Sequence, residues 1–122
     1  MKKNASILGL CLILALALTA CGARYDGSRL GNSEQLTMEY TYFNGTDSQR
    51  LELAAGDTLR GEIVSRGGGL KIVIRREGDA EPVFETENAP SSSFEVEVEQ
   101  AGAYEVELTG RRARGSVDIR KM

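Results

Sequence analysis

Five glutamates in the C-terminal third of the chain are the residues best suited to carry chemistry. Glu95, Glu97 and Glu99 alternate with apolar residues in one run, and Glu105 and Glu107 do so in the next. Carboxylates brought together in this way can bind Ca²⁺ or act as the acid and base of glycoside hydrolysis. If the two runs pair as a hairpin, all five carboxylates lie on one polar face.

A solvated outer face is the simpler interpretation of these glutamates. Charged side chains also protect an apolar strand from edge-to-edge pairing. The chain lacks the Asp-x-Asp-x-Asp loop pattern of calcium sites and has no tryptophan to wall a sugar-cleaving cleft. The sequence therefore favours the solvated face over a cation site or a hydrolytic pair.

The composition excludes most catalytic machinery. The chain has no histidine, which removes Ser-His-Asp and Cys-His nucleophile pairs and most zinc sites. Beyond the first 20 residues its lysines are Lys71 and Lys121, and no Ser-x-x-Lys spacing occurs. We expect a protein that is not an enzyme and that uses no cofactor and no metal ion.

A basic run lies between two alternating runs and is expected to form an exposed loop. Its arginines are Arg111, Arg112 and Arg114. They could contact an anion such as a teichoic acid, a phospholipid headgroup or an acidic partner. Alternatively, an arginine of a neighbouring strand (Arg75, Arg112 or Arg120) reduces the repulsion among the glutamates, because exposed ion pairs contribute little other stability.

An aromatic run near the start of the domain is a second candidate contact surface. It contains Tyr40, Tyr42 and Phe43. In a strand, alternation places the two tyrosines on one face and Phe43 on the other. The run could form a platform for stacking a glycan, but the favoured interpretation is that these rings complete a core with hydroxyls at its rim.

The first 20 residues have the layout of a secretory signal. Lys2 and Lys3 precede an apolar run of 12 residues, Ile7 to Leu18, whereas a membrane-spanning helix needs about 20. Leu18, Thr19, Ala20 and Cys21, followed by Gly22, resemble a bacterial lipobox. The resemblance implies that signal peptidase recognises Leu18, Thr19 and Ala20, and that Cys21 carries a diacylglyceryl thioether and becomes the first mature residue.

The expected location is the extracytoplasmic face of the cell membrane, with the protein held by its acyl chains. Two or more chains exceed what stable attachment requires. The formal net charge is −3, and loss of Lys2 and Lys3 makes it more negative. This acidity argues against nucleic-acid binding and against a peripheral hold on anionic headgroups. The partners we expect are the membrane, through the lipid on Cys21, and an envelope protein or wall polymer.

The chain divides into three parts. Residues 1–20 are the expected signal helix. Residues 21–34 contain the lipidated N-terminus and a segment rich in Gly, Ser, Asn and charge, which we expect to be a flexible stalk of about 20 Å. Residues 35–122 form the expected folded domain.

The domain is expected to be an all-β, antiparallel, two-sheet sandwich of about eight strands. From Leu36 onward, apolar and polar residues alternate in short runs between turn residues such as Gly56-Asp57, Gly67-Gly68-Gly69 and Glu77-Gly78-Asp79. This spacing is typical of sandwiches and barrels. No run after Cys21 keeps a helical period.

Glycines and apolar residues at fixed spacing resemble the jelly-roll sandwiches of bacterial surface lipoproteins, GOLD-like domains and the accessory modules of secreted peptidases. The residues that carry this resemblance are Leu51, Leu53, Gly56, Asp57, Leu59, Gly61, Ile63, Gly69, Leu70, Ile72, Ile74, Gly102, Tyr104, Val106, Leu108, Gly110, Gly115, Ser116, Val117 and Ile119. The resemblance carries no catalytic residue over. It implies a noncatalytic interaction module, with a carbohydrate-binding module or a passive envelope component as alternatives.

Overall fold

The computed structural model describes residues 23–122. The predicted signal helix, the lipobox and Cys21 lie outside these residues. The described chain contains six strands: β1 (Arg24–Asn32), β2 (Gln35–Leu53), β3 (Thr58–Arg76), β4 (Phe84–Thr86), β5 (Ser92–Glu97) and β6 (Gly102–Lys121). All pairings are antiparallel, in the order β1-β2-β6-β3-β4, and β5 also pairs with β3.

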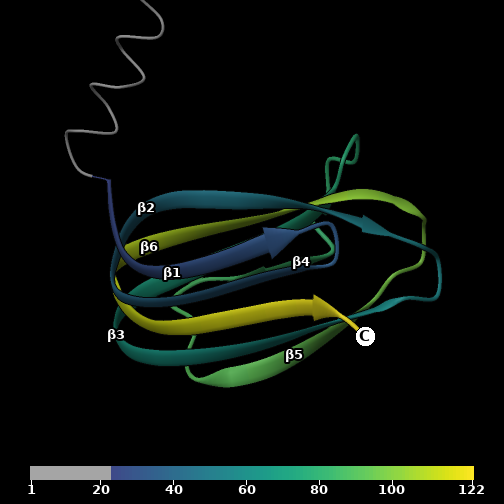
Figure 1. The fold of residues 1–122 in the computed structure, drawn as a ribbon. Helices are drawn as coiled ribbons and strands as arrows, with labels where there is room; N and C mark the ends of the chain where they lie inside the picture. Colours follow the sequence, from purple (N-terminus) through teal and green to yellow (C-terminus); the bar gives the residue numbers. More distant parts are fainter. Residues whose placement is uncertain (1–22) are drawn as a thin grey trace, which may run out of the picture.

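Three long strands bend at one end of the molecule and pass from one layer to the other (Figure 1). The register shifts between Tyr40 and Gly45 in β2 and between Ser65 and Gly69 in β3, opposite residues 110–114 of β6. One layer holds β1, β5, the first halves of β2 and β3, and the second half of β6. The other layer holds β4 and the remaining halves.

The core lies between the two layers. Alternation along each strand sends every second side chain inward, as expected for stacked antiparallel sheets. The side chains with the least solvent exposure come from both halves of the bent strands: Leu36, Met38, Leu51, Leu59, Ile72, Ile74, Val106, Leu108, Val117 and Ile119. The predicted all-β sandwich is therefore confirmed.

The strand count differs from the prediction because hydrogen bonding continues through the bends. Each of β2, β3 and β6 contains two of the eight predicted strands. Gly67, Gly68 and Gly69, expected to form a hairpin turn, lie instead inside β3, where they form its bend.

The predicted flexible stalk is wrong for most of its length. Arg24–Asn32 form β1, which pairs with β2 from Arg24↔Asn44 to Asn32↔Gln35. The segment is polar, but its backbone groups pair with the edge of β2, and Tyr25 packs on the aromatic core residue Phe43, with ring centroids 5.5 Å apart. The folded domain thus begins about ten residues earlier than predicted.

The two ends of the sandwich differ in construction. The bend end holds residues 43–45, 65–69 and 110–114, and the described chain starts there (Figure 1). The loop end holds the connections at 54–57, 77–83 and 98–101 and the C-terminus. The described residues include no helix, and hence none that could span a membrane.

Candidate functional site

On one side of the sandwich, polar contacts connect the edge strands of the two layers and close the gap between them. Nε of Arg29, in β1, lies 2.7 Å from Oδ2 of Asp47, in the other layer, and Nη2 of Arg29 donates to the carbonyl of Ser48 at 3.0 Å. The backbone N–H of Glu52 donates to the carbonyl of Ser33 at 2.9 Å. These contacts tie the outer strands of the two layers together.

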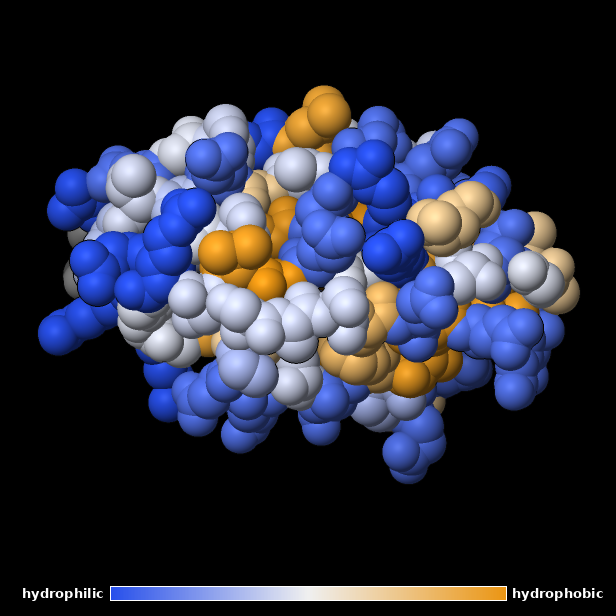
Figure 2. Space-filling view, turned by 90° about the horizontal axis from the view of Figure 1, so that it is seen from below, coloured by the Kyte–Doolittle hydropathy of each residue, from blue (hydrophilic) through white to orange (hydrophobic). Residues whose placement is uncertain are grey.

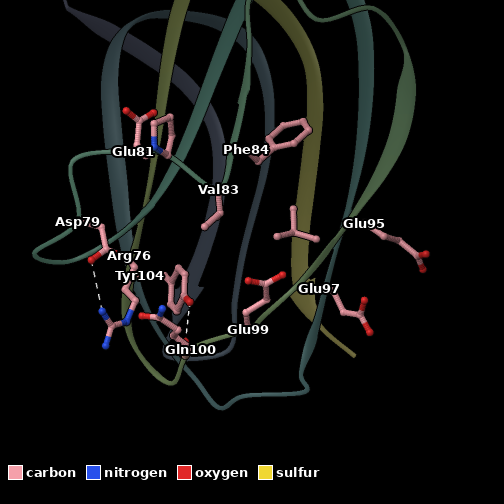
Figure 3. A pocket seen from close by; sticks show the side chains of 12 residues that line it. Arg76, Asp79, Glu81, Val83, Phe84, Glu95, Glu97, Glu99, Gln100 and Tyr104 are labelled. Carbon is pink, nitrogen blue, oxygen red and sulfur yellow. Dashed lines mark hydrogen bonds and ion pairs between the residues drawn. The ribbon is translucent and has the colours of Figure 1, made fainter.

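The opposite side, between β4 and β5, is open. Here a cavity of about 510 Å³ lies between the edges of the two layers, toward the loop end (Figure 3). We call it the edge groove. Its lining residues are Arg76, Asp79, Glu81, Pro82, Val83, Phe84, Glu95, Val96, Glu97, Glu99, Gln100 and Tyr104.

The edge groove has an apolar floor. Val83, Phe84 and Val96 form it. The Phe84 ring also stacks on the ring of Phe94 in the other layer, with centroids 4.0 Å apart and planes 12° from parallel. The Phe94 ring lies over Gly61, where a Cβ atom would come within 2.2 Å of it. Val83 is 46% exposed, and Figure 2, seen from this side, shows hydrophobic surface between hydrophilic side chains.

The rim of the edge groove is acidic. Five carboxylates lie among its lining residues: Asp79, Glu81, Glu95, Glu97 and Glu99. The one cation in the lining, Arg76, is held by Asp79 at 3.4 Å and by the carbonyl of Ala101 at 3.1 Å. Figure 3 shows Glu99 pointing toward the lined space and Glu95 and Glu97 pointing outward. Because the acids outnumber the cation, the rim favours a positively charged partner.

The hairpin that would place all five glutamates on one face does not form. Strand β5, with Glu95 and Glu97, pairs with β3 in one layer, whereas Glu105 and Glu107 lie in the other layer. There Glu105 stands opposite Arg50 and Arg75 in neighbouring strands. The connection at 98–101 crosses between layers, so the two runs never share a face. Within residues 23–122, no three metal-ligating side chains gather into a site.

The aromatic run is split by an irregularity in β2. Tyr40 and Phe43 are each 3% exposed and belong to the core, while Tyr42 is half-buried on the outer side. The register shift between Tyr40 and Phe43 breaks the expected alternation. Burial, with a smaller contribution from Tyr25, raises the pKa of Tyr40 to about 12. Of the three rings in this run, that of Tyr42 alone is partly accessible, and the guanidinium carbon of Arg24 lies 5.0 Å from its centroid.

The arginine run lies in the bend of β6. Arg111, Arg112 and Arg114 are exposed at the bend end, and Ala113 between them is buried. Arg112 has a positive φ of 50°, and its N–H donates to Oδ1 of Asn44 at 3.1 Å. The run is exposed as predicted, but it is part of a strand and lies at the opposite end from the edge groove.

Most of the edge groove was not predicted from the sequence. Much of its floor comes from a three-residue strand, β4, and from the connection before it. The available indication was Val83 and Phe84 after Pro82, an apolar pair between turn residues that is too short to bury a face of its own.

No known family profile and no curated protein matches this chain. Solved structures match at the level of the fold. The periplasmic inhibitor of g-type lysozyme from Aeromonas hydrophila is 15% identical, with a TM-score of 0.51 over 75% of this chain and 89% of its own. The pre-peptidase C-terminal domain of a Bacillus anthracis collagenase is 14% identical, with a TM-score of 0.50 over 81% of this chain and 97% of its own. The chain thus shares a small β-sandwich fold with these proteins, and its resemblance to GOLD-like domains stays a prediction.

Proposed function

We propose that this protein is a bacterial lipoprotein, anchored through Cys21 on the extracytoplasmic face of the cell membrane, whose noncatalytic β-sandwich binds a protein partner through the edge groove. The main support for this proposal is that the two sides of the sandwich differ. One is sealed by Arg29 and the Glu52–Ser33 bond, and the other has a cavity of about 510 Å³ with Val83 exposed.

The construction of the edge groove suits a protein segment. Strands β4 and β5 each pair with β3 alone, so each has one edge without a strand neighbour among the described residues. Such edges can accept an added strand, while the apolar floor receives a side chain and the acidic rim selects for basic residues. The lysozyme inhibitor, which shares the fold, acts on a protein by its description, and this supports a protein partner here.

Replacing Val83 with aspartate should abolish partner capture. The new carboxylate would stand among the rim acids, where an apolar side chain of the partner would dock. We expect at least a tenfold loss of affinity, the size typical of a central interface residue. The measurement is photo-crosslinking of the lipidated protein in intact cells, followed by quantification of the crosslinked protein band.

Val64 provides the matched control. It is 40% exposed, close to the 46% of Val83, but it lies in β3 away from the edge groove. Val64→Asp should leave the band intact. A band that survives Val83→Asp would reject the edge groove as the docking site. Crosslinks to wall polymer that depend on Tyr42 would instead establish the glycan-binding alternative, and the absence of any crosslink would favour a passive envelope role.

Replacing Cys21 with serine should abolish lipid attachment. Serine cannot form the thioether, so the chain should accumulate as an unprocessed precursor without label in cells fed a radiolabelled fatty acid. Cys11→Ser is the matched control, because Cys11 lies in the apolar run before the expected cut and should not affect labelling. A wild-type chain that takes up no label would refute the proposed anchor.

A further inference from the structure

Four arginines at the bend end carry uncompensated positive charge. Arg66, Arg111, Arg112 and Arg114 are exposed, and within the described residues no acid lies within ion-pair distance of them. By contrast, six of the seven other arginines in residues 23–122 have an acidic partner within 4.0 Å: Arg24, Arg29, Arg50, Arg60, Arg76 and Arg120. The seventh, Arg75, stands opposite Glu105 in β6. The four arginines lie on two neighbouring bends, since Gly67 pairs with Arg114 and Gly69 with Arg111.

The acids at this end do not fully offset these arginines. Asp26 is paired with Arg24, and Glu87 with Lys71 at 3.6 Å. Two other acids lie nearby: Asp47 is held by Arg29, and Glu39 is exposed opposite Ser116 of β6. Glu39 can offset at most one of the four charges, so this end keeps an excess of positive charge. Although the net charge of the chain is negative, its charges are separated along the long axis of the domain. The bend end is basic, and the edge groove near the loop end is acidic.

The described chain starts at the same end. Arg24 pairs with Asn44, whose side chain accepts a hydrogen bond from Arg112. A Cβ atom on Gly45 would lie 3.2 Å from that of Ala23. The described chain thus begins at the bend end, beside Arg112 (Figure 1).

The distance from this end to the proposed lipid is short. Ala23 follows Cys21 by two residues, which span at most about 7 Å when fully extended. The predicted stalk would have held the domain about 20 Å from the membrane, but β1 takes its place. A lipid on Cys21 therefore brings the bend end to the level of the headgroups.

We propose that the bend end docks on the anionic phospholipid headgroups of the membrane that holds the lipid on Cys21. This inference rests on the proposed anchor. The acyl chains hold the protein at the membrane, and Arg66, Arg111, Arg112 and Arg114 set its orientation. Each arginine near an anionic surface raises the equilibrium ratio of docked to undocked protein about fivefold. The bend end then contacts the membrane, and the edge groove, near the loop end, opens to the side at a distance from the headgroups.

The test uses the full lipidated protein with one reporter cysteine. Residues 23–122 contain no cysteine, so Ser65→Cys at the bend end or Ala55→Cys at the loop end gives a single site for a fluorophore. The labelled protein is placed in nanodiscs with nitroxide-headgroup quencher lipid, containing either phosphatidylglycerol or only phosphatidylcholine. We expect quenching at position 65 to be at least about twofold stronger in the anionic discs and to lose this excess in 1 M salt. We expect little quenching at position 55 in either.

Two charge-matched variants separate local docking from net charge. Arg111→Gln, Arg112→Asn and Arg114→Gln together should remove the excess quenching; asparagine is chosen at 112 because it tolerates a positive φ. The control variant removes the same number of charges outside the bend end and should keep the excess quenching. Its substitutions are Arg50→Gln, Arg60→Gln and Arg120→Gln. Arg66→Gln alone should lower the excess quenching partially, which gives a readout should the triple variant fail to fold.

Equal quenching at position 65 in both lipids, or equal loss in the two triple variants, would overturn the docking proposal. Mass spectrometry of the same sample reports whether Cys21 carries lipid. A lipidated protein with equal quenching refutes docking alone, whereas a protein without lipid refutes the anchor on which docking rests.

Discussion

Replacing Gly68 with alanine is expected to cost about 3 kcal/mol or more of folding free energy. Gly68 has a φ of 71°, and an added Cβ would lie 2.1 Å from the carbonyl oxygen of Arg112 and 2.6 Å from that of Arg111. Both obstacles are backbone atoms of the neighbouring bend in β6. A methyl group fits only if the two bends separate, which disturbs both layers at once.

Gly78 isolates the steric part of this effect. Its φ is 90°, similarly unfavourable for alanine, but no atom lies within 4 Å of its added Cβ. Gly78→Ala should cost only the conformational strain, about 1–2 kcal/mol. Urea unfolding followed by circular dichroism gives both values. Equal losses in the two variants would mean that the close approach of the bends does not matter to stability.

The bends also explain why the sequence yields the layers of the fold but not its continuous strands. Alternation depends on which side chains face the core, and this pattern identified both halves of β2, β3 and β6. A glycine cluster such as residues 67–69 suits a hairpin turn and a bend equally well, because both need positive φ and close backbone approach. The partner bend that decides between them lies more than 40 residues away in the sequence, at Arg112.

Strand β1 was missed for a different reason. Its residues are mostly polar and exposed, so it lacks the apolar alternation from which strands are predicted. Its stability comes from backbone pairing with β2 and from Tyr25, whose hydroxyl donates to the carbonyl of Ser28 at 2.5 Å. Neither contribution leaves a periodic pattern.

The candidate site was predictable only in part. The glutamates of β5 and of the connection after it were identified as an exposed acidic surface, and Glu95, Glu97 and Glu99 do line the edge groove. Whether they would lie beside Glu105 and Glu107 could not be predicted, since local alternation does not determine which strands pair. The apolar floor could not be predicted, because Phe84 and Val96 come from opposite layers and meet only in the folded chain.

Replacing Leu108 with alanine should cost about 2–5 kcal/mol of folding free energy, the range for buried leucines. Leu108 has no solvent exposure and lies in the first half of β6, between Asp47 of β2 and Ile72 of β3. Its side chain faces the other layer, so its loss leaves a cavity in the core. Urea unfolding measures the change.

Leu30→Ala is the control for this last change. This substitution removes the same atoms from β1, but the Leu30 side chain is 57% exposed. We therefore expect the free energy of unfolding to change by no more than about 0.5 kcal/mol. With no cysteine after Cys21, packing must hold the layers together, and a domain of this size has about 5–15 kcal/mol in total. Leu108→Ala should therefore consume a large fraction of the stability. Similar small losses for both variants would contradict a core that lies between two layers, and with it the edge groove that those layers form.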